Sequence, residues 1–181
     1  MLVGHSYAGS VISNAATQVD NDPSRTGGWV LVLPLFSHRA RQSAGLTANR
    51  REIARVIWTR NSPKWRFDDA TLERTALAFD NPDHVVVVIH SYRHRLGLAP
   101  GYAPYQELEE RLAQQPVIPV PAITLDGLAD GTFPATEGAA SAGHFTGPRV
   151  HYQVPDAGHN LPQEAPEAFA DAVLEVAKLR S

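Results

Sequence analysis

The hydrophobic pattern at the amino end predicts two strands with a helix between them. Residues 2–4 are apolar and compatible with a strand, the polar and small residues 5–9 interrupt them, and residues 10–19 have helical composition. Turn residues then precede the apolar run 29–33, which is typical of a strand buried on both faces. We therefore expect strand, sharp turn, helix and a second parallel strand.

The middle of the chain shows helical periodicity. Four consecutive valines within residues 84–96 favour a strand, but the preceding Asn81-Pro82-Asp83 resembles a helix entry, and we favour a helix. Amphipathic helices are predicted at residues 49–59, 68–79 and 105–114.

The last third alternates between strand and helix patterns. Residues 121–125 and 149–154 are predicted strands, and residues 166–179 form a predicted closing helix with an apolar inner face. Alternation at both ends, with helices concentrated at residues 46–115, predicts the α/β class: a parallel sheet flanked by helices and interrupted by a helical insertion.

Composition narrows the class of protein. The 181 residues are 43% apolar and 19% charged, which fits one globular unit. The chain has no Cys, which excludes a disulfide framework and a cysteine nucleophile and favours the cytoplasm. A formal charge of −3 argues against a nucleic-acid partner, and no apolar run approaches the ~20 residues of a membrane span. Residues 25–66 hold nine Arg or Lys against Glu52 alone, which favours a solvated helix face over phosphate contacts.

The turn Gly4-His5-Ser6-Tyr7-Ala8-Gly9 has the context of a nucleophilic serine. A serine hydroxyl reacts only when it is held exposed and a base removes its proton, and a tight strand-to-helix turn with small flanking residues achieves this. Gly4 and Ala8 are those flanks. The following helix directs its N–H groups at the site, and Tyr7 N–H is the first candidate oxyanion donor. The alternative is a structural turn or helix N-cap.

Two later residues are candidate partners of Ser6. Asp130 follows the first predicted late strand and His159 follows the second, and the carboxyl ends of parallel strands meet at one edge. The order Ser, Asp, His is the one associated with α/β folds. Asp126 and Asp156 are rival acids, but Asp126 lies at the strand end and Asp156 only three residues before the histidine, so Asp130 is preferred.

We call the turn around Ser6 the elbow. Together with the Gly-Leu-Ala-Asp loop that ends at Asp130 and the Gly-His-Asn loop around His159, it makes the chain resemble the C-terminal part of an α/β-hydrolase. The resemblance implies Ser6 as nucleophile, His159 as general base and then acid, and Asp130 as the carboxylate that orients the imidazole. It implies no cofactor and a small-molecule substrate. The family's epoxide hydrolases and dehalogenases use an aspartate nucleophile, so Ser6 favours an ester or related acyl substrate.

The resemblance also divides the chain into a core, residues 1–45 and 116–181, and a helical cap, residues 46–115. The cap would supply pocket walls, and His5, Trp65 and Tyr92 are candidate substrate contacts, although packing is the first interpretation of Trp65 and Tyr92.

His90 and His94 are four residues apart, as metal ligands on a helix can be. The chain supplies no HExxH glutamate beside them, and Arg93 and Arg95 would repel a cation, so no metal site is expected.

The family's first strands, and the loop that donates a second oxyanion N–H, have no counterpart in this sequence. We therefore expect an N-terminally truncated chain with impaired activity, because loss of one such donor costs about 10²–10³ in rate. The alternative function is non-catalytic binding of a small molecule, or a structural remnant of such a hydrolase. A separation of Asp130 and His159 beyond hydrogen-bond distance, or a turn around Ser6 without backbone strain, would favour that alternative.

Overall fold

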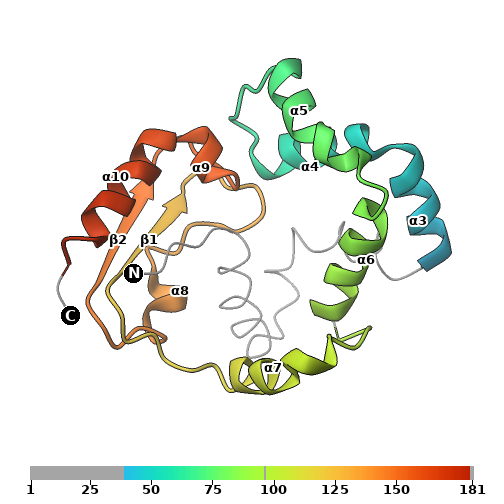
Figure 1. The fold of residues 1–181 in the computed structure, drawn as a ribbon. Coiled ribbons are helices and arrows are strands. Elements are labelled where there is room, and N and C mark those ends of the chain that lie inside the picture. The colour runs from blue at the N-terminus through green and yellow to red at the C-terminus, as the bar shows by residue number, and fades with distance from the viewer. Residues whose placement is uncertain (1–38, 96, 180–181) are drawn as a thin grey trace.

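Helices fill the first half of the described chain, and a pair of strands lies in the second half (Figure 1). The computed structural model describes residues 39–95 and 97–179. The elements predicted at residues 2–4, 10–19 and 29–33 therefore lie outside the described residues. The helices of the first half are α3 (Arg39–Ala48), α4 (Arg50–Asn61), α5 (Asp69–Ala76), α6 (His84–Arg95) and α7 (Gln106–Ala113), with short 3₁₀ helices η2 (Leu77–Asp80) and η3 (Ala103–Tyr105).

The strands β1 (Ala122–Gly127) and β2 (Arg149–Val154) pair in parallel, as predicted. Their register runs from Ala122 opposite Arg149 to Gly127 opposite Val154. The two strands therefore end side by side, and the loops that leave them start from the same edge.

One face of this sheet is covered by α10 (Pro166–Val176), which lies along the strands in Figure 1. Val154, Ala157 and Leu161 form the buried cluster beneath it, and Leu125 and Phe169 pack against them. Burial of these apolar side chains holds the loop after β2 against the sheet. The predicted helix at 166–179 is confirmed, with its regular part ending at Val176.

The segment that was ambiguous between strand and helix is the helix α6. Val85 and Ile89, four residues apart, are buried, and Leu46 and Tyr92 pack on them. Val86 and Val87 are 70% and 60% exposed. The spacing of the buried positions is that of one helix face, so packing overrides the strand preference of valine.

The other predicted helices are confirmed. The ends of those predicted at 49–59 and 105–114 shift by one to two residues, whereas the helix predicted at 68–79 is α-helical only to Ala76 and continues as the 3₁₀ helix η2 to Asp80. The expected inner faces are only partly buried: Val56 of α4 is 64% exposed, and Leu108 and Leu112 of α7 are 52% and 46% exposed. The hydrophobic pattern did not predict α3. It also did not predict α8 (Ala139–Ala142) and α9 (Leu161–Glu164), because four residues are too few for a helical period to show.

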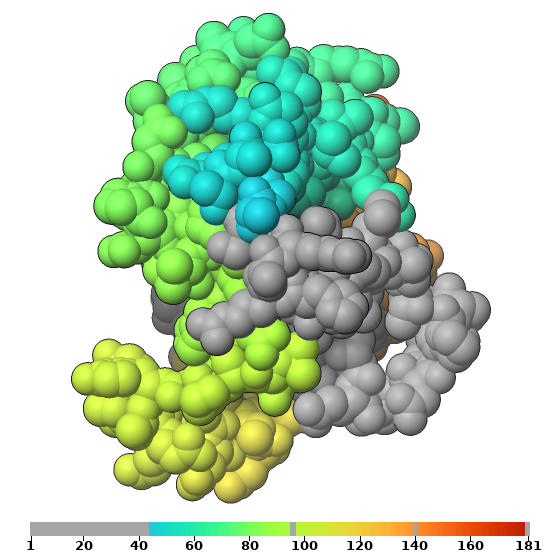
Figure 2. Space-filling view, turned by 90° about the vertical axis from the view of Figure 1, so that its right-hand side faces the viewer, coloured from blue at the N-terminus to red at the C-terminus, as the bar shows by residue number. Residues whose placement is uncertain are grey.

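Two basic residues of α4 pair with acidic residues of the following helices. Arg51 bonds to Glu73 at 3.1 Å and to Asp80 at 3.0 Å, and Arg55 bonds to Asp69 at 2.7 Å. The Arg51 guanidinium lowers the pKa of the Asp80 carboxyl chiefly by hydrogen bonding. These exposed pairs give the basic residues partners within the chain, in keeping with a solvated helix surface. Figure 2 shows α3 and α4 grouped at one end of the molecule and α7 at the other.

In the described parts of the chain, no helix has both the length and the apolar character needed to cross a bilayer.

Candidate active site

Asp130 lies in the loop after β1, residues 128–133, which we call the acid loop. Its Oδ1 accepts hydrogen bonds from Thr132 N at 2.7 Å and Phe133 N at 3.0 Å. Its own N–H donates to the Gly127 carbonyl at the end of the strand, at 3.2 Å. An aspartate that bonds to backbone groups two and three residues ahead closes a tight turn. The turn fixes one carboxylate oxygen and directs the other away from the loop.

The second oxygen of Asp130 meets His159, which lies in the loop after β2. We call residues 155–160 the histidine loop. Asp130 Oδ2 and His159 Nδ1 are 3.0 Å apart, and the two side chains are 13% and 20% exposed. A carboxylate only accepts hydrogen bonds, so Nδ1 carries the proton and Nε2 is the basic nitrogen of the neutral ring. The separation of these two atoms is within hydrogen-bond distance, as a catalytic pair requires. The strain of the elbow, which also bears on a non-catalytic protein, concerns residues outside those described.

The rival acids lie elsewhere. Asp126 Oδ2 accepts a hydrogen bond from Thr136 N at 3.1 Å and is 3.6 Å from His151 Nε2. Asp156 pairs with Lys64 at 2.5 Å on the surface. The carboxylate that bonds to His159 is therefore that of Asp130, the one preferred from the sequence.

The end of α4 joins the acid loop to the histidine loop. The Asn61 carbonyl oxygen accepts hydrogen bonds from Gly131 N at 2.9 Å and from His159 N at 3.2 Å. A side chain at Gly131 would collide with the Arg60 carbonyl, so only glycine allows this approach. The sequence interpretation missed this junction because a backbone carbonyl leaves no residue signature.

Ser62 and Glu164 are further contacts that the sequence did not predict. Ser62 is fully buried and its Oγ accepts hydrogen bonds from Asn160, while the Glu164 carboxylate accepts from Gly158 N and Asn160 N. For Glu164 a signal existed: an acidic residue one turn after Asn160, the N-cap of α9, can reach back to the helix start. No comparable signal marks Ser62.

Three of the other predicted residues, His5, Ser6 and Tyr7, lie outside the described residues. Trp65 is in an aromatic cluster, with ring centroids 5.0 Å from both Trp58 and Phe67. Tyr92 packs on the buried pair of α6. Both positions are those of packing residues, and a substrate contact for either stays a prediction.

The histidines of α6 are stacked. The rings of His90 and His94 are 6.2 Å apart, and His94 Nε2 lies 3.3 Å from Glu109 Oε1 of α7. Across residues 39–95 and 97–179, no three His, Asp or Glu side chains are grouped so as to hold a metal ion.

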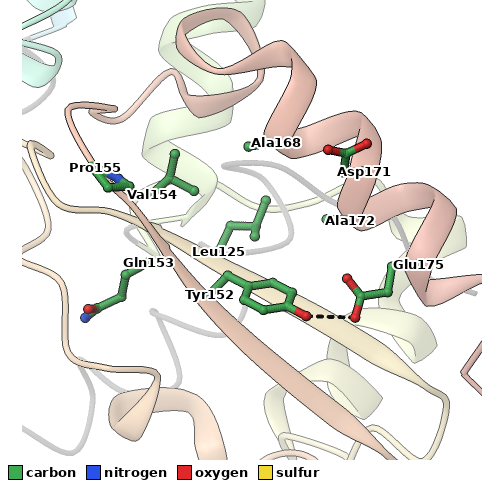
Figure 3. A pocket seen from close by; sticks show the side chains of 9 residues that line it. All are labelled: Leu125, Tyr152, Gln153, Val154, Pro155, Ala168, Asp171, Ala172 and Glu175. Atoms are coloured by element: carbon green, nitrogen blue, oxygen red, sulfur yellow. Dashed lines mark hydrogen bonds between the residues drawn. The ribbon is translucent and has the colours of Figure 1, made fainter.

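A shallow groove of about 310 Å³ lies between β2 and α10 (Figure 3). Leu125 and Ala172 are part of its apolar floor, and Tyr152 Oη donates to Glu175 at 2.7 Å along its side. That hydrogen bond raises the pKa of Tyr152. Neither Asp130 nor His159 lines the groove, so it is separate from the candidate active site.

Comparison with known proteins gives the family. A model of the alpha/beta hydrolase family matches residues 1–172. The structure is also similar to a crystal structure from Klebsiella pneumoniae, of a protein provisionally assigned as an epoxide hydrolase, with a TM-score of 0.81 and 42% sequence identity. The match covers 88% of this chain and 52% of that one, so the chain spans about half the length of its structural neighbour. No curated protein matched the chain. The chain belongs to the alpha/beta hydrolase family, and its fold class is that predicted from the sequence.

Proposed function

We propose that the chain is a serine hydrolase that cleaves an ester or related acyl substrate. In this proposal Ser6 is the nucleophile, His159 is the base and Asp130 orients the imidazole. Ser6 Oγ attacks the acyl carbon and passes its proton to His159 Nε2, and the developing oxyanion is stabilised by Tyr7 N–H. The imidazolium then protonates the leaving group, and water, activated by the same ring, releases the acid.

The observation that carries the proposal is the contact of 3.0 Å between Asp130 Oδ2 and His159 Nδ1. The two residues are 29 positions apart and come from loops after different strands. The acid is held by its own turn, and the imidazole is held in one tautomer by the acid. This is the arrangement that prepares a histidine to accept a proton from a hydroxyl group.

Ser6 supports acyl transfer over epoxide opening. The structural neighbour is provisionally assigned as an epoxide hydrolase, and the members of the family that open epoxides use an aspartate as nucleophile. This chain has serine at the matching position of the elbow, and a serine attacks an acyl carbon to give an ester intermediate. The neighbour's chemistry is therefore the second candidate and not the first.

The proposal includes the division into a core and a cap. Residues 46–115 would form the cap over a small-molecule substrate, with Trp65 and Tyr92 as candidate contacts, and residues 1–45 and 116–181 would form the core. We also keep the expectation of a cytoplasmic protein that needs no cofactor.

The test is covalent labelling by a fluorophosphonate probe. The chain and its Ser6→Ala variant, with equal circular dichroism spectra, are incubated with the probe and the modified peptide is identified by mass spectrometry. We expect modification at Ser6 and none in the variant. A folded chain that gains no Ser6-dependent label contradicts the proposal.

A simple epoxide distinguishes the second candidate. If the chain hydrolyses a small aryl epoxide, and the Ser6→Ala variant does so at the same rate, epoxide opening replaces acyl transfer as the function. We expect no such turnover.

A further inference from the structure

The backbone on either side of His159 is held by a single carboxylate. Glu164 Oε2 accepts a hydrogen bond from Gly158 N at 2.7 Å, and Oε1 accepts one from Asn160 N at 2.9 Å. Charge-assisted bonds to both oxygens fix the separation of the two N–H groups. Glu164 therefore restricts the 159–160 peptide, which adjoins His159, and the 157–158 peptide one residue before it, while the 158–159 peptide is held by the Asn61 carbonyl.

Further acceptors come from the carboxyl end of α4. The Asn61 carbonyl accepts from His159 N at 3.2 Å, and Ser62 Oγ accepts from Asn160 N at 3.2 Å and Asn160 Nδ2 at 3.0 Å. Ser62 has no exposed surface. Together with the carboxylate, these groups give an acceptor to each successive N–H of the segment that contains the histidine.

The packing is as close as the hydrogen bonding. A Cβ atom at Gly158 would lie 2.7 Å from Ser62 Cα, closer than real Cβ atoms come to a neighbour. The histidine loop and the end of α4 are therefore in contact along their backbones, and neither can shift without displacing the other. The same Asn61 carbonyl also binds the acid loop through Gly131 N, so Asp130 and His159 have one anchor in common.

We propose that Glu164 and Ser62 are positioning residues that keep His159 Nδ1 directed at Asp130 Oδ2. This inference rests on the function proposed above. Neither side chain bonds to the imidazole or to the carboxylate of the pair, and both act through residues 158–160, Glu164 on their backbone and Ser62 on the backbone and side chain of Asn160. Loss of either contact lets the loop rotate, so that the imidazole reaches Ser6 at a less favourable distance and angle. A misplacement of about 1 Å of this kind costs on the order of 10²-fold in rate.

The experiment measures geometry and reactivity separately in Glu164→Gln, Ser62→Ala and the double variant. The glutamine keeps the size of the side chain but offers one acceptor oxygen in place of two. Proton NMR at low temperature follows the far-downfield signal of the Nδ1 proton shared with Asp130, assigned by its loss in His159→Ala. Phosphonylation of Ser6 gives a maximal rate and a concentration for half-maximal rate.

In Glu164→Gln we expect the downfield signal to broaden or move, and the maximal rate to fall about 10–100-fold at an unchanged half-maximal concentration. In Ser62→Ala the maximal rate should fall less, because Asn160 N keeps its hydrogen bond to Glu164. In the double variant the maximal rate should fall by more than the product of the two single-variant factors, since Glu164 and Ser62 both accept from Asn160 N.

Glu167→Gln is the matched control, because Glu167 is exposed on the first turn of α10. Its signal and rate should equal those of the unmodified chain. An unchanged signal and rate in folded Glu164→Gln overturn the inference, as does a rate that falls only in proportion to the folded fraction. If Glu164→Gln does not fold, the Nδ1 proton signal and the maximal rate of Ser62→Ala decide the test.

The two proposals fail in different ways. Absence of a Ser6-dependent label in the unmodified chain contradicts the proposed function. The response of the Nδ1 signal to Glu164→Gln still shows whether the carboxylate positions the imidazole, because that readout needs no reaction.

Discussion

The loops that follow β1 and β2 differ from the helices α5 and α6 in what holds them in place. In the loops, Asp130 and His159 make hydrogen bonds of 2.7–3.2 Å, and Glu164 of the adjoining helix α9 accepts two more from the histidine loop. In α5 and α6 the main ordering contact is burial of a few apolar side chains, among them Leu72 and Val85, because the ion pairs that link α5 to α4 are exposed and contribute little. Hydrogen bonds have direction and fix the positions of atoms, whereas apolar burial has none and contributes mainly stability. We therefore expect changes in the loops to alter reactivity and changes in the helices to alter stability.

The largest expected effect is that of Asp130→Asn. The asparagine keeps Oδ1 as acceptor for the turn, but its amide nitrogen would donate to His159 Nδ1 and stabilise the wrong tautomer. We expect the maximal rate of Ser6 phosphonylation to fall by about 10⁴, with the midpoint of chemical denaturation little changed.

Asp126→Asn is the matched change on the same segment. Asp126 lies within β1 and faces His151, so the rate should stay within a few-fold of the unmodified chain. A large loss here with little loss in Asp130→Asn would reassign the acid.

The second effect, on stability, is that of Leu72→Ala in α5. Leu72 is 1% exposed, and truncation of such a leucine costs about 2–5 kcal/mol of unfolding free energy. The labelling rate per folded molecule should not change. Chemical denaturation measures the first quantity and labelling at low temperature the second.

Leu77→Ala, five residues further along, is the control, because Leu77 is 72% exposed. It should change stability very little. Equal losses in the two variants would mean that α5 is not held by burial of Leu72.

The smallest effect is a pH dependence that arises in the helices. Burial, followed by repulsion from Arg50, lowers the pKa of His84 below its ordinary value of 6.5. As pH falls below 6.5, His84 is protonated in the unfolded chain at a higher pH than in the folded chain. The folded state therefore loses stability as pH falls from 6.5 towards the lowered pKa. The loss is small because His84 is only partly buried. The midpoint of chemical denaturation should therefore fall more between about pH 7.5 and 5.5 in the unmodified chain than in His84→Gln. Equal falls would contradict this assignment.

The sequence predicted the parts of the site that depend on the chain's local order. Asp130 and His159 each follow a strand, and parallel strands bring their following loops to one edge, so the pair could be found from position alone. Asp126 could be set aside for the same reason, since it lies within the strand and not after it.

The contacts that hold the pair could not be found in this way. Ser62 and Asn160 are 98 positions apart, and the Asn61 contact uses a carbonyl that every residue has. Such contacts depend on where the end of α4 lies in the tertiary structure, which no local sequence pattern predicts. Likewise α6 was ambiguous because an unbroken apolar run has no period, and only the burial of Val85 and Ile89 shows which face is inside.

The composition of α6 has a consequence for the handling of this protein. Residues 85–89 are five consecutive β-branched residues without proline or charge, and the helix keeps their backbone groups bonded to one another. If α6 unwinds, the same segment has the composition of strands that stack between molecules into fibrils. Heating is therefore expected to end in precipitation and not in a reversible transition, and refolding yields should depend on protein concentration.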